Sequence, residues 1–126
     1  MKLLGYEVFS LDGRLNRAAF IKLMLLTGII TTAVSVAVWL VLPALLKYFL
    51  FVAILVVYLV HFSLAARRFH DLGKGIYWAV AYLFVSYFGR VFEPVSLIHL
   101  IFFLYLLIKK GDAGPNQYGP DPLDSK

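Results

Sequence analysis

The feature that most constrains this chain is an uncharged apolar run over residues 23–42. As an α-helix, which rises 1.5 Å per residue, this run spans about 30 Å, the thickness of the hydrocarbon core of a bilayer. A second uncharged run covers residues 48–66. Hydrophobic residues make up 62% of the 126 residues and charged residues only 15%. A soluble domain of this length could not bury so many apolar side chains in its core. The sequence therefore predicts an integral membrane protein.

Two shorter apolar runs follow, over residues 76–88 and 95–108. Runs of this length are also typical of re-entrant segments. The flanking residues can lengthen both runs, because Lys74 and Arg90 can extend their aliphatic stems along the run over residues 76–88, and Pro94 suits the first turn of a helix. We predict one all-α membrane domain over residues 1–126, a polytopic helical bundle with four transmembrane helices at residues 17–42, 48–66, 76–90 and 94–108. Asn16 is the expected N-cap of the first helix.

The basic residues give this domain an orientation. Of the twelve Lys and Arg residues, four precede or begin the first apolar run, three lie between the second and third runs, and three lie in the tail. Only Lys47 and Arg90 fall on the other side, and cytoplasmic loops are enriched in Lys and Arg. Both chain ends are therefore predicted to be cytoplasmic, with residues 1–16 at the cytoplasmic interface and residues 109–126 as a tail. The N-terminal segment is too polar for a signal peptide, so we expect the first helix to remain as an anchor.

Several common chemistries lack a sequence signal. The net charge of +5 is explained by membrane topology, and we expect no nucleic-acid partner. The chain has no cysteine and three dispersed histidines, so we expect no metal site and no cofactor. Serine residues without a positioned His–acid pair give no support for a hydrolase, and no catalytic residue is assigned.

Three polar motifs separate the apolar runs: GRLNR at residues 13–17, RRFHDLG at residues 67–73 and GPNQYGPDP at residues 114–122. Together, and in this order, they resemble the membrane family called domain of unknown function 805, from about residue 9 to residue 122. The resemblance implies a small, multi-pass protein of the bacterial inner membrane. It implies no agreed biochemical activity.

With both ends inside, all three motifs fall on the cytoplasmic face. We expect a polar cluster there, formed by Arg14, Arg17, Arg67, His70, Asp71, Asn116, Tyr118 and Asp121. Neighbouring residues of a helix point about 100° apart, so Arg67 is assigned to the face of His70 and Asp71, and Arg68 to the lipid-facing side. The predicted topology anchors are Arg68, Lys74, Lys109 and Lys110.

Two readings of this cluster are open. In the structural reading, Arg67 and Arg68 only orient the protein, Asp71 pairs with an arginine, and the tail is a Gly/Pro-rich cap. In the functional reading, the planar donor groups of the arginines bind phosphate at the level of the lipid headgroups. We also expect the tail to be docked against the first two motifs, with Asn116, Tyr118 and Asp121 bound to their arginines.

Three classes of function follow. We place first a binding or assembly role, in which the cluster engages anionic lipid headgroups or a larger membrane complex. The second is an oligomeric pore or transporter using His61, His99, Arg90 or Glu93. The third is a lipid-modifying enzyme with His70 and Asp71 as an acid–base pair, but no nucleophile is evident, and we expect a non-enzymatic protein.

His61 is expected to make an interhelical hydrogen bond. Small residues at Thr27, Gly28, Thr31, Thr32 and Ser35 suit close helix packing within the chain or in a homo-oligomer.

Overall fold

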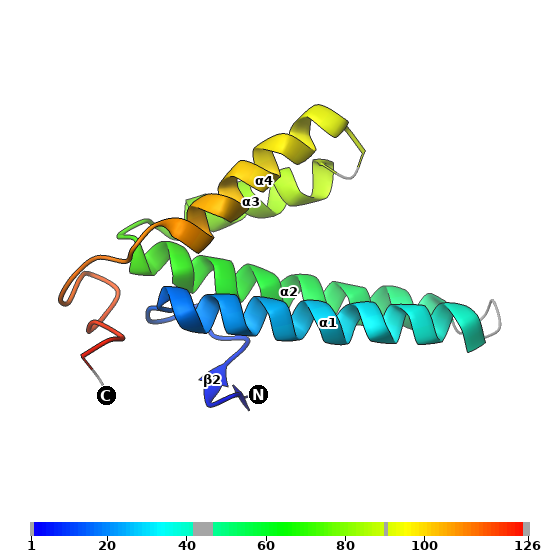
Figure 1. The fold of residues 1–126 in the computed structure, drawn as a ribbon, viewed down its shortest axis with the longest axis horizontal. Coiled ribbons are helices and arrows are strands. Elements are labelled where there is room, and N and C mark those ends of the chain that lie inside the picture. The colour runs from blue at the N-terminus through cyan, green and yellow to red at the C-terminus, as the bar shows by residue number, and fades with distance from the viewer. Residues whose placement is uncertain (1, 42–46, 90, 125–126) are drawn as a thin grey trace.

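The computed structural model describes residues 2–41, 47–89 and 91–124. Within these ranges the chain forms four helices, α1 (Arg17–Val41), α2 (Lys47–Asp71), α3 (Ile76–Phe88) and α4 (Glu93–Ile108), preceded by a short β-hairpin (Figure 1). Helix α2 continues five residues beyond the predicted membrane segment and so includes the first five residues of the second polar motif. The predicted ends of the first and third membrane segments, at residues 42 and 90, lie outside the described residues.

The helix ends follow from local chemistry. Asn16 caps α1 as predicted, because its side-chain oxygen accepts a hydrogen bond from the backbone N–H of Ala19 at 2.9 Å. Pro94 occupies the first turn of α4, where its missing N–H costs nothing. The chain leaves α2 after Asp71 and turns at Gly73, whose φ of 68° lies in the left-handed region that favours glycine. The backbone N–H groups of Gly73 and Lys74 donate to carbonyls of the last helical turn, which completes a Schellman motif.

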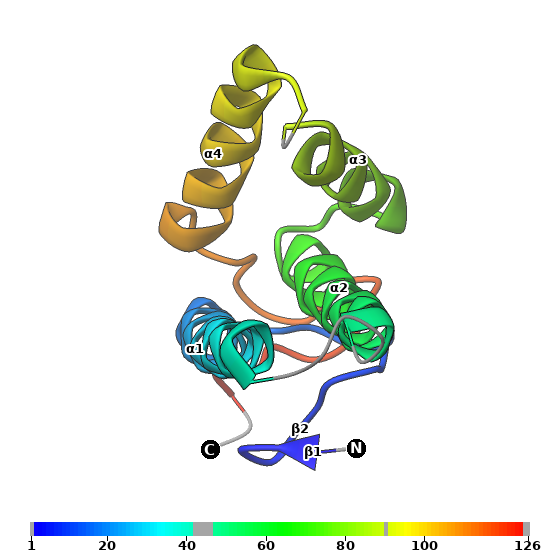
Figure 2. The ribbon, with the colours of Figure 1, turned by 90° about the vertical axis from the view of Figure 1, so that its right-hand side faces the viewer.

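The helices form two antiparallel pairs. Helices α1 and α2 lie side by side, and so do α3 and α4; the two pairs meet at one end and diverge toward the other (Figure 1). Seen along the first pair, α3 lies over α2 and α4 lies over α1 (Figure 2). We refer to the end where the pairs meet as the junction. The predicted bundle is therefore closed at the junction and open beyond it.

The core lies at the junction. Phe69 of α2 is only 1% exposed, and its ring packs against Tyr82 of α3 and Phe102 of α4 with centroid separations of 6.4 and 6.5 Å. The neighbouring Ala65 and Ala66 are fully buried, because their small side chains allow other segments to approach α2 closely. The buried hydrophobic residues are Val8, Leu15, Ala19, Phe20, Leu23, Val60, Leu64, Ala65, Ala66, Phe69, Leu72, Ala79, Tyr82 and Leu106.

Among the described residues, two stretches are long and apolar enough to cross a membrane, Arg17–Val38 in α1 and Val52–Asp71 in α2, with 22 and 20 residues. Helices α3 and α4 are also apolar, but they have 13 and 16 residues. Large apolar side chains, such as Ile29 and Leu40 on α1, are more than 60% exposed. Lipid is the solvent that such a surface requires.

Residues 2–16 form an N-terminal arm that packs along α2. The arm begins with the hairpin of β1 (Lys2–Leu3) and β2 (Tyr6–Glu7), and the Leu4–Gly5 turn has positive φ at both residues. Ser63 of α2 donates a hydrogen bond to the carbonyl of Ser10 at 2.5 Å. The arm and the C-terminal tail lie on the same side of the molecule, near the start of α1 (Figure 1).

Candidate functional site

The centre of the junction is a buried carboxylate held between two buried guanidinium groups. Asp71, the last residue of α2, accepts a hydrogen bond from Nε of Arg14 at 3.1 Å and one from Nη1 of Arg68. The side chains are 1% exposed for Arg14, none for Arg68 and 4% for Asp71. We call these three residues the arginine–aspartate cluster. Because one carboxylate compensates part of two positive charges, the remaining guanidinium donors must find other acceptors.

Arg68 finds these acceptors at the end of α4. Its Nε donates to the carbonyl of Leu106 at 3.0 Å, and its Nη2 donates to the carbonyl of Lys109. Arg17, at the start of α1, donates to the carbonyl of Ile108 at 3.2 Å. The last carbonyls of a helix lack intrahelical partners and carry partial negative charge, so arginine donors stabilise the end of α4. Two arginines thereby attach α4 to the other helix pair.

The predicted orientation of Arg67 and Arg68 was wrong. Arg68, which we expected to face lipid, is fully buried in the arginine–aspartate cluster. Arg67 turns instead to the arm, where its Nη1 donates to the carbonyl of Glu7 at 2.6 Å. The helix continues through Asp71, as the prediction required. Asp71 is four residues after Arg67 and three after Arg68, and both spacings place two side chains on the same face of a helix. Asp71 therefore lies within reach of either arginine, and the packing of α4 selects Arg68.

Arg14 connects the cluster to the tail. Its Nη1 donates to the carbonyl of Gly114 at 2.6 Å, and its Nη2 donates to the carbonyl of Asp112 at 2.5 Å. The backbone N–H of Asp112 donates to the carbonyl of Asp71 at 2.7 Å. The tail is thus docked, as predicted, and it satisfies an unpaired carbonyl at the end of α2. Its contact with Arg14 uses backbone carbonyls rather than the predicted side chains.

The predicted tail residues reach the second motif through His70. The side-chain amide of Asn116 donates to the carbonyl of His70 at 3.0 Å. The ring of Tyr118 stacks on the His70 ring with centroids 4.0 Å apart and an interplanar angle of 3°. Nδ1 of His70 lies 3.2 Å from the carbonyl of Gly13 in the arm. His70 therefore lies between the arm and the tail.

Asp121 closes a turn within the tail. Its carboxylate accepts hydrogen bonds from the backbone N–H groups of Leu123 and Gly114, both at 2.9 Å. These hydrogen bonds favour the charged form, the one from Leu123 most strongly, and lower the pKa of the Asp121 carboxyl below its usual value. Asp121 stabilises the shape of the tail rather than binding an arginine side chain directly.

Gly111 and Asp112 contribute to this site but were not predicted from the sequence, whereas Gly73 belongs to a predicted motif. A Cβ atom on Gly111 would overlap the carboxylate of Asp71, and one on Gly73 would lie 2.5 Å from Oδ2 of Asp112. Glycine at both positions lets the tail approach the end of α2. Gly73 belongs to the second polar motif, whereas Gly111 and Asp112 precede the tail motif. Their only sequence signal is that a Gly-Asp pair, typical of turns, directly follows Lys109 and Lys110.

The geometry decides which basic groups are available to an external ligand. Arg14 and Arg68 are buried and already bound to protein acceptors. Arg17, Lys109 and Lys110 are exposed, and Arg17 and Lys110 line a hollow of about 380 Å³ beside the start of α1. We call Arg17, Lys109 and Lys110 the basic rim. Lys74, a predicted anchor, lies with Nζ 4.5 Å from the ring centre of Trp78, as expected for a cation–π contact.

Comparison with known proteins gives the same family as the motifs. The family described as "Protein of unknown function (DUF805)" matches residues 8–120. "Inner membrane protein YhaI" of Escherichia coli K12 is 32% identical over 118 residues, which cover 94% of this chain and 88% of that protein. The protein of the same description in Escherichia coli O157:H7 matches with the same values. No solved structure matches. The family match covers all four helices with parts of the arm and of the docked tail, and the chain belongs to this family of membrane proteins of unknown function.

Proposed function

We propose that this is a four-span protein of the bacterial inner membrane, with both chain ends in the cytoplasm, that binds anionic lipid headgroups at the junction. The arginine–aspartate cluster holds the arm, the tail and α4 in fixed positions. The basic rim, placed by this framework, binds the headgroup phosphate. The proposal thus combines the two readings of the sequence: the buried arginines are structural, and the exposed basic residues bind.

The topology rests on charge and on the positions of the chain ends. Ten of the twelve Lys and Arg residues lie on the cytoplasmic side if all four helices cross, which follows the positive-inside rule. The arm and the tail both pack against the C-terminal end of α2. Helices α3 and α4 are short for a bilayer, but tilt and local thinning accommodate such helices at modest cost.

The observation that carries the binding proposal is the hollow beside the start of α1. Arg17 and Lys110 line it from two different segments, and both are exposed. Asp71, Asp112 and Asp121 also line it, but the five cationic side chains of the arginine–aspartate cluster and the basic rim outnumber these three carboxylates. The positive charge of the basic rim, near the start of a helix, therefore suits a phosphate group.

A catalytic role for the second motif receives less support from this geometry. His70 stacks on Tyr118 and contacts the carbonyl of Gly13, while Asp71 accepts hydrogen bonds from Arg14 and Arg68. The two side chains are thus directed to separate partners. A general acid and base would instead need to meet at one reacting group.

Single-cysteine labelling tests the topology, because the natural sequence has no cysteine. Leu123→Cys places a thiol in the tail and Phe92→Cys places one between α3 and α4; both positions are more than half exposed. In intact spheroplasts, a membrane-impermeant maleimide should label Phe92→Cys and leave Leu123→Cys unlabelled until the membrane is opened. Labelling of Leu123→Cys from outside would overturn the four-span topology.

Headgroup binding is tested in nanodiscs that contain phosphatidylcholine with or without phosphatidylglycerol, by native mass spectrometry of the lipids retained. We expect phosphatidylglycerol to be retained by the wild type and lost from a variant with Arg17→Gln and Lys110→Gln. Lys22→Gln is the matched control, because Lys22 is exposed on α1 but lies outside the hollow. Equal retention by the double variant and the control would refute the binding role of the basic rim.

A further inference from the structure

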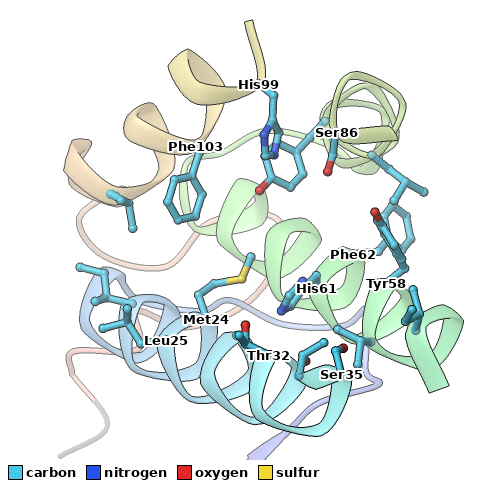
Figure 3. A pocket seen from close by; sticks show the side chains of 18 residues that line it. Met24, Leu25, Thr32, Ser35, Tyr58, His61, Phe62, Ser86, His99 and Phe103 are labelled. Atoms are coloured by element: carbon cyan, nitrogen blue, oxygen red, sulfur yellow. The ribbon is translucent and has the colours of Figure 1, made fainter. Parts of the chain in front are cut away.

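A second and larger cavity lies between the two helix pairs, where they diverge beyond the junction (Figure 3). Its volume is about 540 Å³, and all four helices contribute to its lining. Cavities that bind small molecules commonly have volumes of about 300–1,000 Å³. The headgroup hollow uses a different set of residues, so the two sites are independent.

Several uncharged polar groups lie in the otherwise apolar lining of this cavity. Its hydroxyl, phenol and imidazole groups come from Thr31, Thr32, Ser35, Tyr58, His61, Tyr82, Ser86 and His99. Among the described residues that line it, none is Asp, Glu, Lys or Arg. Polar groups within a membrane usually face one another or a functional cavity. This set can bind oxygen atoms through hydrogen bonds, but it offers no full charge to compensate a charged ligand.

His61 illustrates how the polarity of the cavity is set. The hydroxyl of Thr27 donates its one proton to the carbonyl of Leu23 at 2.7 Å. In its 2.9 Å contact with Nε2 of His61 this hydroxyl therefore accepts, and the proton of that hydrogen bond is on Nε2. The contact also joins α1 to α2, as predicted for His61. In the neutral ring, Nδ1 is then a hydrogen-bond acceptor. His61 and the nearby hydroxyl groups therefore give the cavity both acceptors and donors.

Aromatic rings form one wall. The rings of Tyr82 and His99 have centroids 5.0 Å apart, and those of His99 and Phe103 have centroids 6.4 Å apart. Phe62 and Tyr58 line the cavity from α2 (Figure 3). Aromatic side chains at these separations favour stacked or edge-on contact with another flat ring.

An apolar groove adjoins the cavity between α2 and α3. It has a volume of about 460 Å³ and shares four lining residues with the cavity, Ile54, Tyr58, Phe62 and Leu83. Its other lining residues are Leu55, Leu59, Phe84 and Tyr87. The cavity, with polar groups in its lining, thus continues into an apolar groove. This arrangement suits a molecule with a polar head, bound in the cavity, and a hydrocarbon tail, bound in the groove.

We propose that this cavity binds a neutral lipid whose head is a flat ring bearing carbonyl or hydroxyl oxygens, the chemistry of a membrane quinone. The ring lies among Tyr82, His99 and Phe103; its carbonyl oxygens accept hydrogen bonds from hydroxyl groups of the lining, and a ring hydroxyl can donate to Nδ1 of His61. The tail follows the groove between α2 and α3 to the surrounding lipid. A charged headgroup is disfavoured because the lining contains no opposite charge.

The test uses the full chain in phosphatidylcholine nanodiscs and ubiquinone-1, a short-chain quinone, with empty nanodiscs as the background. Ser86→Phe fills the cavity from α3; Ala81→Phe makes a bulky change on the same helix at an exposed position outside the cavity. We expect saturable binding to the wild type and to Ala81→Phe, and about tenfold weaker binding to Ser86→Phe. If Ser86→Phe fails to fold, Ser35→Phe fills the cavity from α1 and replaces it.

Binding of ubiquinone-1 no greater than to empty nanodiscs would overturn the proposal. Equal affinity of Ser86→Phe and Ala81→Phe would also overturn it, because the quinone would then bind elsewhere. Diacylglycerol, added as a competitor, separates ring recognition from general lipid binding: it should not displace the quinone, and displacement at equal concentration would exclude specificity for a ring. Loss of headgroup binding in the basic-rim variant would leave these results unchanged.

Discussion

Replacing Arg68 by lysine tests the central role of the arginine–aspartate cluster. The substitution retains the positive charge, so the charge distribution that orients the chain does not change. It removes the planar group that reaches three acceptors at once: the carboxylate of Asp71 and the carbonyls of Leu106 and Lys109. We expect a marked loss of stability and a loosened tail. Arg67→Lys, one residue earlier on the same helix, is the matched control.

The magnitude follows from the number of hydrogen bonds lost. A lysine ammonium at position 68 can keep its ion pair with Asp71, but it leaves the two α4 carbonyls without their donor. At about 1.5 kcal/mol for each hydrogen bond to a charged group, Arg68→Lys should lower the free energy of unfolding by about 3 kcal/mol. Arg67 donates one described hydrogen bond, to the carbonyl of Glu7, which lysine can also reach. Its replacement should cost less than about 1 kcal/mol.

The assay is thermal unfolding in phosphatidylcholine nanodiscs, followed by tryptophan fluorescence. For a chain of this length, the expected loss corresponds to a decrease in melting temperature of about 10 °C for Arg68→Lys. Limited trypsin digestion should also cleave after Lys109 and Lys110 faster than in the wild type. An unchanged melting temperature for Arg68→Lys, or an equal decrease for Arg67→Lys, would refute the assignment of Arg68 to the core of the junction.

Three further predictions concern the tail. Gly111→Ala should lower the free energy of unfolding by about 1–3 kcal/mol, because its methyl group would overlap the Asp71 carboxylate; unchanged thermal stability would mean that the tail does not approach this closely. Tyr118→Leu removes the stacking on His70 and should speed trypsin cleavage after Lys110, while equal cleavage rates would show that the stacking does not hold the tail. Because the pKa of Asp121 is lower in the folded state, its charged carboxylate stabilises the docked tail at pH values above the unfolded-state pKa, near 4. This stabilisation is lost as the pH falls through the pKa of the folded state. Hydrogen exchange of the Gly114 and Leu123 amides should therefore gain protection from pH 3 to pH 6 in the wild type, relative to Asp121→Asn.

The helices could be read from the sequence because their determinants are local. Uncharged runs predicted all four helical segments, and the short side chain of Asn16 before an apolar helix predicted its cap. The motifs also predicted that the tail docks on the second motif. The partners of individual tail residues were not predictable, because Asp112 and Gly114 bind Arg14 through backbone carbonyls, which every residue type has.

The choice between Arg67 and Arg68 shows where local information ends. Helical geometry allows either side chain to meet Asp71, since residues three and four positions apart share a face. The choice depends on where α4 ends, because its last carbonyls provide the additional acceptors for Arg68. The sequence alone determined that this chain has four apolar helices, an uneven distribution of Lys and Arg along them and three polar motifs. Only the tertiary structure decided which arginine pairs with Asp71, and it opened a cavity with polar groups in its lining between two diverging helix pairs, because both depend on contacts between segments far apart in the chain.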